Sequence, residues 1–340
     1  MPQGAFSIGF AMDENISKKL IAEKAGVSKR TVTRVLYQNG SVSEKTKEKV
    51  MRVIEEVGYT QNKLAISLSK NQNNNFVAMF VPDMTNYYYL EMFDNIMTLL
   101  NEREYTVSLY RITKQNFCQV LEHVIQYRVA AIINLTFMAI PANYLKKLRG
   151  AKIKVIHPNI TDDPVKIEID YSDAIKEAFE NLWNKGRRNF RFLCGAEREF
   201  IVDKRIQRYL SLLSEHGVGQ AEETVIWGDY PEVSALQAGY TGIKQLGDSA
   251  HKIDAVFALN DMMAMGAMKA FSEAGMEIGK DVLVVGFDNI LIGEYLQTPL
   301  STIDSNIALE TKKYVSYIFD ENIDESPIKS KFIGRESSGK

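Results

Sequence analysis

The sequence predicts a small all-α helix-turn-helix unit followed by an α/β core of two doubly wound lobes built on parallel sheets. Three observations support this fold class. Residues 20–36 hold two short helical patterns around a glycine, residues 71–75 read NQNNN, and residues 76–340 alternate short apolar runs with helical patterns. At 340 residues, the chain is long enough for two or three domains.

The first two helices are predicted around the sequence LIAEKAGVSKRTVTRVL. Ser17 and Ser28 precede them as N-caps, and Gly26 supplies the permissive residue that a sharp turn between helices needs. On the second helix, apolar residues at i, i+3 and i+4 turn inward. These inward residues are Val32, Val35 and Leu36.

The opposite face of the second helix is polar and basic. It presents Arg30, Thr33, Arg34 and Tyr37, with Lys29 at the exposed N-terminal end. Such a face suits a DNA major groove, where a recognition helix offers its N-terminal side chains to base edges. The alternative is a helix pair whose cationic face is only solvated.

A third helix is predicted over residues 44–57, capped by Ser43 and ended by Gly58. Residues 63–69 are predicted to form a helix of barely two turns, which is too short to be stable alone in water. The NQNNN linker follows it, and this polar segment places a domain boundary before the core.

The sequence IAEKAGVS, with Thr31-Val32, Arg34-Val35, Val42-Ser43, Lys45-Thr46 and Lys49-Val50 at fixed spacing, resembles the headpiece of the lactose-repressor family of transcription regulators. The resemblance implies a hinge helix that folds when two subunits sit on DNA, with Leu68 wedged into the minor groove. The DNA-binding residues it implies are Ser28, Lys29, Arg30, Thr31, Thr33, Arg34, Tyr37, Asn62, Lys63, Ala65 and Leu68.

Charge is concentrated where nucleic acid would bind. Residues 16–75 hold twelve Lys/Arg and five Glu, a balance of +7, although the whole chain has a net charge of −2. Residues 76–340 hold 29 Lys/Arg and 36 Asp/Glu, a balance of −7. The two cysteines, Cys118 and Cys194, give neither a disulfide framework nor a zinc spacing, which favours a reducing cytoplasm.

The core pattern predicts two similar lobes of strands and helices. In the first lobe, the predicted strands are 76–81, 106–110, 130–135 and 154–157, and the helices are 90–102, 117–126 and 142–148. In the second lobe, the strands are 190–194, 224–227, 255–258 and 282–287, and the helices are 174–184, 203–215, 234–246 and 262–274. Residues 301–304, 308–319 and 331–333 add a strand, a helix and a strand that complete both lobes.

The predicted domains are an extension over residues 1–15 with no assigned role, a headpiece over 16–61, a hinge and linker over 62–75, and a core over 76–340. The first lobe takes about 76–170 and 305–325, and the second about 171–304 and 326–340. This two-lobe core resembles the periplasmic sugar-binding-protein fold used by the same family. The resemblance covers nearly the whole chain from Ile16 onward.

Ligands bind beyond the carboxyl ends of strands in open α/β sheets, so the loops there should line a cleft between the lobes. Four loops carry suitable side chains: 81–89, 203–209, 259–266 and 285–289. The effector-binding residues that the resemblance implies are Asn86, Tyr88, Tyr89, Asp170, Arg205, Asn260 and Asp288. Simpler roles exist, because the tyrosines could cap the following helix and Asp261 is expected to cap the next one.

One residue departs from the family pattern, since Arg208 stands where the family usually has glycine. This change could alter lobe packing or the pocket. A sugar or phosphosugar effector is expected from the family, while a nucleoside or a protein corepressor stays open.

An enzyme is not expected, and neither a cofactor nor a metal is. Nucleotide-binding glycine motifs and a Gly-x-Ser-x-Gly motif are absent, and the four histidines are scattered. Gly247-Asp248-Ser249 with His251 resembles a hydrolase motif only superficially, because it falls in a surface loop between a helix and a strand.

The sequence therefore predicts a cytoplasmic, homodimeric repressor that binds a pseudo-palindromic operator in double-stranded DNA and is controlled by a small effector. The alternatives are a solute-binding protein of a transport system, which the basic headpiece and the missing signal peptide disfavour, and an enzyme on the same α/β frame.

Overall fold

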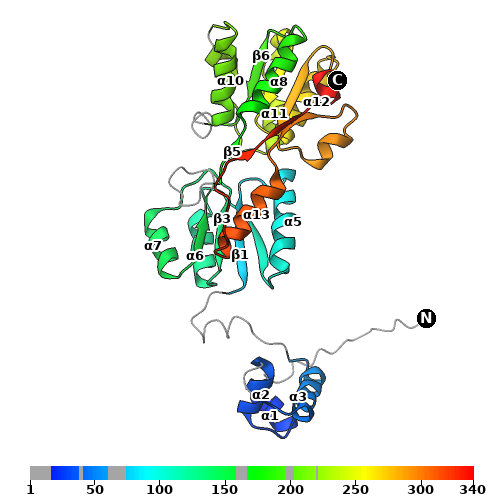
Figure 1. Cartoon of the computed structure of the whole chain (residues 1–340). Coiled ribbons are helices and arrows are strands. Elements are labelled where there is room, and N and C mark those ends of the chain that lie inside the picture. The colour runs from blue at the N-terminus through cyan, green and yellow to red at the C-terminus, as the bar shows by residue number, and fades with distance from the viewer. Residues whose placement is uncertain (1–16, 38–40, 60–73, 158–166, 197–202, 220) are drawn as a thin grey trace, which may run out of the picture. The chain divides into compact units, whose positions relative to one another are not determined.

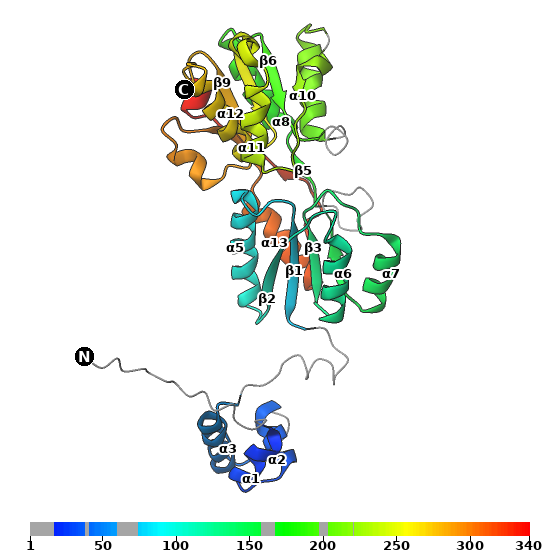
Figure 2. The same cartoon turned by 180° about the vertical axis from the view of Figure 1, so that it is seen from behind.

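The computed structural model of the chain describes residues 17–37, 41–59, 74–157, 167–196, 203–219 and 221–340 (Figures 1 and 2). The chain divides into a smaller unit that ends at Lys70 and a larger unit that begins at Asn71. The predicted extension over residues 1–15 lies outside the described residues, as do the hinge residues Asn62, Lys63, Ala65 and Leu68. No helix in the described part of the chain is long and apolar enough to cross a membrane.

The smaller unit is a three-helix bundle of α1 (Lys18–Lys24), α2 (Lys29–Tyr37) and α3 (Glu44–Val57). Ser17 caps α1, Ser43 caps α3, and Gly58 ends α3 with a φ of 64°, as the sequence predicts. Gly26 turns the chain between α1 and α2 with a φ of 58°, a region that glycine enters without strain. The small core joins all three helices through Ile21, Ala22, Ala25, Val32, Val35, Val50 and Val53.

The first lobe has a four-stranded parallel sheet in the order β2-β1-β3-β4. Its strands are β1 (Phe76–Val81), β2 (Thr106–Arg111), β3 (Ala131–Asn134) and β4 (Lys154–Ile156). Helices α5 (Tyr87–Asn101) and α13 (Ile307–Ile318) cover one face, and α6 (Phe117–Gln126) and α7 (Ala142–Gly150) cover the other. Because both faces are covered, β1 is apolar throughout, with Val77, Met79 and Val81 packing toward α5 and Ala78 and Phe80 toward α6.

The second lobe has a six-stranded sheet in the order β12-β10-β9-β8-β6-β7, in which only β12 is antiparallel to its neighbour. Its strands are β6 (Phe190–Leu193), β7 (Val225–Ile226), β8 (Ala255–Ala258), β9 (Leu283–Phe287), β10 (Ser301–Asp304) and β12 (Lys331–Ile333). Its helices are α8 (Ser172–Asn184), α10 (Lys204–Glu215), α11 (Ala235–Lys244) and α12 (Asp261–Glu273).

The chain passes between the lobes through a short two-stranded ribbon and one turn. Strand β5 (Ile169–Asp170) pairs in parallel with β11 (Ile328–Lys329), and the turn between β10 and α13 makes the other passage. Figures 1 and 2 show β5 between the two sheets. The predicted fold class, an all-α helix-turn-helix unit and a two-lobe parallel α/β core, is confirmed.

The described residues of the second lobe also form four short segments of 3-10 helix: η1 (Ala221–Thr224), η2 (Gly247–Lys252), η3 (Leu291–Tyr295) and η4 (Glu336–Ser338). They account for two differences from the predicted elements. The strand expected over 224–227 is only two residues long because η1 takes Thr224, and the Gly247–Lys252 segment expected as a loop is helical.

Candidate functional site

Helix α2, the predicted recognition helix, begins with a compact hydrogen-bond network. The Ser28 hydroxyl accepts the Thr31 amide at 3.0 Å, which confirms it as the cap, and its Oγ lies 2.9 Å from Thr31 Oγ1. Thr33 Oγ1 donates to the carbonyl oxygen of Lys29 at 2.9 Å. The hydroxyls of Thr31 and Thr33 are therefore engaged within the helix.

The cationic side chains of α2 remain on the surface. Lys29, Arg30 and Arg34 are exposed, whereas Val32 and Val35 are buried against the other two helices. Tyr37 is the last residue of α2, but its side chain lies outside the described residues. The exposed face of α2 thus carries three cationic side chains.

Hydrogen bonds join the two lobes across the carboxyl ends of their strands. Asp83, in the loop after β1, accepts the amide of Ala235 at the start of α11 at 3.1 Å. The hydroxyl oxygens of Tyr89 and Tyr230 lie 3.3 Å apart, and Glu91 on α5 accepts the amide of Leu291 at 2.8 Å. The region where the two lobes meet, called the cleft below, is therefore lined by polar groups from both.

Asn86, Tyr88 and Tyr89 have separate roles at this cleft. Asn86 caps α5 by accepting the amide of Tyr88 at 3.1 Å, so the simpler capping role falls to the asparagine. Tyr88 donates to Glu310 Oε2 at 2.9 Å, and Tyr89 reaches across to the second lobe. Burial raises the pKa of both phenols well above its ordinary value, with Glu310 adding to the effect at Tyr88 and Tyr230 at Tyr89.

Arg205 is held by a carboxylate of its own lobe. Its Nε and Nη2 donate to the two oxygens of Asp203 at 3.0 and 2.7 Å, and its Nη1 donates to the carbonyl oxygen of Leu259 at 2.8 Å. The guanidinium also lies 5.7 Å from the ring centre of Tyr171 and 5.5 Å from that of Phe287. Its charge is therefore already paired. Arg205 can offer a ligand fewer free hydrogen-bond donors and a weaker positive charge than an unpaired arginine could.

Asp288, at the end of β9, is a different kind of polar group. It is 7 % exposed, has a φ of 108°, and its carboxylate has no hydrogen-bond partner among the residues that the structure describes. Burial raises its pKa well above the ordinary value, the charge of Asp261 raises it further, and Arg205 lowers it. This carboxylate is free to accept a hydrogen bond from a hydroxyl.

Asn260 takes the capping role that was expected of Asp261. Asn260 caps α12, because its Oδ1 accepts the amide of Met263 at 2.9 Å, so the prediction that Asp261 is the cap is wrong. Asp261 is the first residue of the helix and turns into the lobe, where it accepts from Thr302 Oγ1 at 2.6 Å and from the Ile290 amide at 3.0 Å. The cap forms one position earlier because the residue before the helix has the extended backbone that capping requires.

Asp170 lies on the crossover ribbon rather than at the centre of the cleft. It accepts from the Ser172 amide at 3.0 Å and from Lys329 Nζ at 2.6 Å, and these two partners lower its pKa to about 2. The next residue, Tyr171, packs edge to face on Phe287 at 5.7 Å beside Arg205. Tyr171 thus lies beside Arg205, while Asp170 is bound to the ribbon and to the start of α8.

Other cleft groups were not singled out from the sequence. Glu310 on α13 is buried and accepts hydrogen bonds from Tyr88 and Tyr314. Tyr230 and Asp83 make the contacts between lobes described above. Asp83 and Tyr230 follow strands β1 and β7, so their positions at strand ends could have indicated them, whereas Glu310 lies inside a helix with no such signal.

A cavity of about 250 Å³ lies between residues of the two lobes. Its lining is Pro82, Arg111, Ile112, Thr113, Lys114, Gln115, Thr136, Phe137, Met138, Pro231 and Glu232. Lys114 of the first lobe and Glu232 of the second form an ion pair of 2.5 Å at its rim. The cavity therefore has residues of both lobes in its wall.

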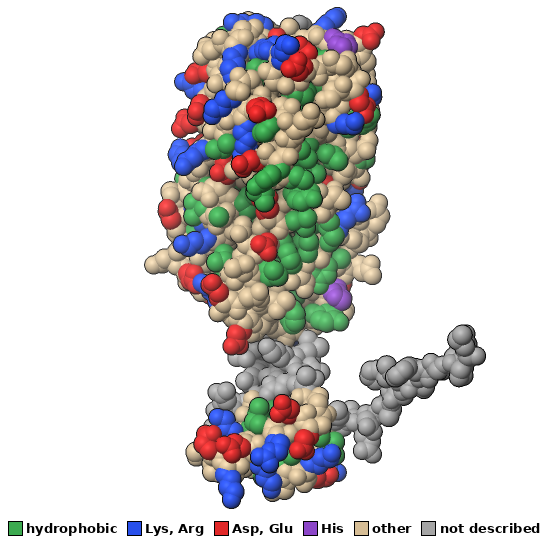
Figure 3. All heavy atoms as spheres, turned by 90° about the vertical axis from the view of Figure 1, so that its right-hand side faces the viewer, with side chains coloured by type: hydrophobic (Ala, Val, Ile, Leu, Met, Phe, Trp, Pro, Cys, Tyr) green, Lys and Arg blue, Asp and Glu red, His purple; other side chains and the backbone are tan. Residues whose placement is uncertain are grey.

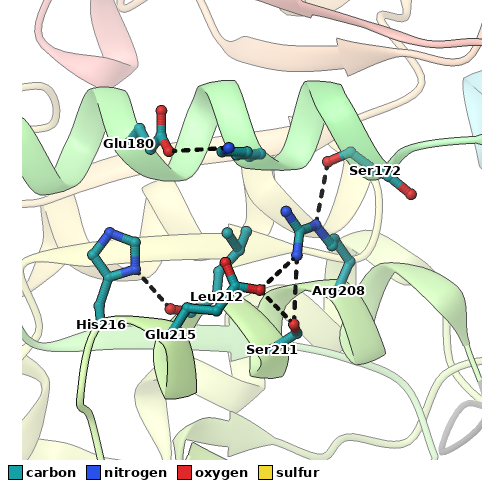
Figure 4. Close-up of polar contacts among 8 residues, drawn as sticks. Ser172, Glu180, Arg208, Ser211, Leu212, Glu215 and His216 are labelled. Carbon is teal, nitrogen blue, oxygen red and sulfur yellow. Dashed lines mark hydrogen bonds and ion pairs between the residues drawn. The ribbon is translucent and has the colours of Figure 1, made fainter.

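The side chain of Arg208 lies between α8 and α10 (Figure 4). Its Nη1 pairs with Glu215 at 2.9 Å and its Nε donates to the carbonyl oxygen of Ser172 at 3.4 Å. The departure from glycine at this position thus affects helix packing in the second lobe.

The fold and these sites define a class of protein: a DNA-binding transcription regulator with a helix-turn-helix headpiece and a two-lobe core. Comparison with known proteins agrees. Residues 19–62 match the family "Bacterial regulatory proteins, lacI family", and residues 179–332 match the family "Periplasmic binding protein-like domain". Residues 19–62 are thus similar to the lacI family of bacterial regulatory proteins, the family that the headpiece sequence resembles.

Similar proteins extend the match over most of the chain. Catabolite control protein A of Priestia megaterium is 25% identical over 324 residues, covering 92% of this chain and 95% of that protein. Two solved structures share the fold. The lac repressor dimer bound to operator and the anti-inducer ONPF has a TM-score of 0.75 at 20% identity, covering 96% of this chain and 99% of that one. A regulator, the CelR–cellobiose complex, has a TM-score of 0.64 at 22% identity, covering 95% and 100%.

Proposed function

We propose that this regulator is a homodimeric, cytoplasmic repressor whose affinity for operator DNA is controlled by a small ligand in the cleft between its lobes. The observation that carries the proposal is the pairing of an exposed cationic helix, α2, with a cleft whose walls come from two hydrogen-bonded lobes. A ligand that contacts both walls would change the balance between open and closed lobes.

Within this proposal, headpiece and hinge over residues 16–75 bind DNA, and the core over 76–340 binds the effector. The hinge residues Asn62, Lys63, Ala65 and Leu68 remain predicted DNA contacts. In the cleft, Asp288 accepts a ligand hydroxyl, and Tyr88, Tyr89 and Arg205 position the ligand. The Oδ1 atoms of Asn86 and Asn260 cap helices, so these residues contact the ligand through their side-chain NH2 groups.

The charges of the cleft favour an uncharged sugar over a phosphosugar. The central cation, Arg205, is neutralised by Asp203, and the carboxyl groups of Asp288, Asp261 and Glu310 lie nearby. A phosphate would add negative charge to this group of acids, whereas sugar hydroxyls can donate to them. The cellobiose complex of a regulator with the same fold agrees with a carbohydrate effector.

A hydrophobic face suits the proposed dimer. Figure 3 shows hydrophobic side chains gathered on one face of the larger unit. Exposed apolar residues of both lobes meet where Glu91 binds the Leu291 amide: Tyr87 and Leu90 on α5, and Leu291 and Tyr295 on η3. A second copy bound to this face would contact both lobes, so movement of either lobe would change the dimer interface. The two headpieces of the dimer would bind an operator with twofold symmetry.

The alternative is a solute-binding protein of a transport system. Such a protein would share the two-lobe core, but the cationic helix α2 would have no role in its function.

The test of DNA binding is a gel-shift titration with an operator selected from random DNA. Arg34→Ala should weaken binding at least tenfold through loss of a phosphate contact, while Arg52→Ala, an exposed arginine on α3, should change it little. Equal binding by both variants would contradict the use of α2.

The same titration tests control by a ligand. A panel of neutral sugars and their phosphates is screened for release of wild-type protein from the operator. Asp288→Ala should keep operator binding but lose the response to the sugar that releases wild type, because the ligand hydroxyl loses its hydrogen-bond acceptor. An unchanged response would place the effector elsewhere.

A further inference from the structure

The cleft holds more buried acids than cations among the residues that the structure describes. Asp288, at the end of β9, and Glu310, on α13, are 7 % and 4 % exposed, and neither forms an ion pair with a described residue. Arg205 gives two hydrogen bonds to Asp203, so these two charges cancel. Buried charges in proteins are normally paired, because removing an unpaired charge from water is costly. The described residues therefore leave the cleft with an excess of negative charge.

Glu310 is fixed in place by two phenols. Tyr88 donates to its Oε2 at 2.9 Å, and Tyr314 donates to its Oε1. Burial raises the pKa of Glu310, and the two phenols oppose that rise, which favours the carboxylate form. Tyr88 gives its one proton to Glu310, so towards a ligand its oxygen can still accept a hydrogen bond.

Two tyrosine rings, one from each lobe, lie close to both acids. Tyr88 is on α5, and Tyr171 precedes α8 in the second lobe. Burial raises the pKa of each phenol, and the charges of Glu310 and Asp288 raise it further, so both carboxylates lie near both tyrosines. The face of an aromatic ring attracts a cation. Carboxylates beside tyrosine rings therefore suit an ammonium group.

Two polar groups at the neighbouring ends of β9 and β10 have no hydrogen-bond partner among the described residues. One is the carboxylate of Asp288, whose own amide donates to the carbonyl oxygen of Ile303 at 2.9 Å. The other is the hydroxyl of Ser305, which is fully buried in the turn between β10 and α13. An ammonium group has three donors and no acceptor, so it can serve several such acceptors at once.

Resting on the proposed function, in which a carbohydrate in the cleft controls DNA binding, we propose that this effector is an amino sugar with a protonated amino group. The ammonium group donates to Asp288, and Glu310 supplies the second negative charge while it keeps its tyrosine partners. Glu310 therefore determines the preference for a cationic sugar over a neutral one.

The test measures release of the full-length protein from its selected operator by matched sets of sugars. The probes are glucosamine, galactosamine and mannosamine, and each is compared at about pH 7 with its parent hexose and its N-acetyl derivative, which are uncharged. At least one amino sugar should act at a concentration roughly tenfold or more below that of its two uncharged counterparts. The reason is that a hydrogen bond between charged groups contributes more than one between neutral groups.

Three variants test the role of Glu310. Glu310→Gln removes the charge but keeps the size of the side chain and an oxygen that can accept from Tyr88. It should bind the operator and lose most of the difference between the amino sugar and its parent. Glu310→Asp, which keeps the charge, should retain the difference, and Glu177→Gln, the same change at an exposed glutamate of α8, should leave it intact. If Glu310→Gln fails to bind the operator, the comparison of sugars on wild-type protein decides alone.

The outcomes separate this inference from the function on which it rests. Release by an uncharged sugar at the same concentration as the amino sugar, or at a lower one, overturns the inference but leaves control by a ligand intact. A preference for the amino sugar that survives in Glu310→Gln overturns the role of Glu310. If the protein binds its operator and no sugar of the panel releases it, control by a carbohydrate is contradicted and the inference fails with it.

Discussion

Asp261 is a carboxylate buried inside the second lobe. It is 1 % exposed and accepts hydrogen bonds from the Thr302 hydroxyl and the Ile290 amide, and its Oδ1 lies where a side chain on Gly286 would have to go. Burial raises its pKa from 3.8 to about 7, and the hydrogen bond from Thr302 opposes this rise. The folded protein therefore binds a proton at this site more tightly than the unfolded chain.

This shift predicts that the second lobe becomes less stable as pH rises. A raised carboxyl pKa gives stability that is complete below pH 3.8 and is lost as pH rises through about 7. Between pH 5 and pH 7.5, the free energy of unfolding should fall by roughly 2 kcal/mol from this residue. Urea unfolding followed by the fluorescence of Trp183 and Trp227, both in the second lobe, measures it.

Asp261→Asn is the matched variant, because an amide keeps the size of the side chain and does not titrate. Its unfolding free energy should change less with pH than that of the wild type by the same roughly 2 kcal/mol. The assignment would be contradicted if the two proteins lost stability in parallel over this range.

At the scale of residues, the sequence predicts the role of a side chain when its hydrogen-bond partner is close in the chain. The caps Ser17, Ser28 and Ser43 bond to residues three positions away, so each could be predicted from its local pattern. Glu310 accepts from Tyr88, 222 positions away, which only the packing of α13 against α5 brings together. The neighbours Asn260 and Asp261 show how far local sequence can predict a cap, since both residue types can cap a helix and the sequence does not say which of them does.

At the scale of elements, α11 and α12 pack at two glycines. A Cβ on Gly239 would lie 2.0 Å from the carbonyl oxygen of Met263, and one on Gly266 would lie 2.1 Å from that of Leu236. Both obstacles are backbone atoms, so the helices would have to separate. This contact holds the N-terminus of α11, whose Ala235 amide binds Asp83 of the first lobe.

Gly239→Ala should therefore destabilise the second lobe by about 3 kcal/mol, because the strain of separating two packed helices exceeds the gain in helix propensity. The urea midpoint of tryptophan fluorescence should fall by about 1 M. Gly150→Ala in α7 is the control, since nothing lies within 4 Å of its added Cβ and its stability should be unchanged or slightly higher. A Gly239→Ala protein as stable as this control would refute the close packing.

Element boundaries follow from local chemistry where caps and apolar periods agree. The helix at Phe117–Gln126 and the strands at Phe76–Val81, Ala255–Ala258 and Lys331–Ile333 were predicted to the residue. Strand β7 shortened to two residues because η1 precedes it. The pairing of β5 with β11 joins segments about 160 residues apart, which no local pattern could indicate.

At the scale of the whole core, two backbone amides of the second lobe are bound by carboxylates of the first. The Ala235 amide donates to Asp83 at 3.1 Å, and the Leu291 amide donates to Glu91 at 2.8 Å. Both bonds cross between lobes but belong to separate elements, α11 and η3. If each lobe moves as a rigid body, both bonds form and break together.

Asp83→Ala should therefore speed amide hydrogen exchange at the distant Leu291 amide as well as at Ala235. Likewise, Glu91→Ala should speed exchange at the distant Ala235 amide as well as at Leu291. Loss of a hydrogen bond to a charged acceptor removes roughly 1.5–3 kcal/mol, so the closed arrangement should open at least tenfold more often. Exchange at an amide inside a single lobe, such as the Val284 amide of β9, is the control and should not change. If each variant affects only the amide that it contacts, the lobes do not move as units. A ligand bridging them would then need another route to change the fit of the headpieces to DNA.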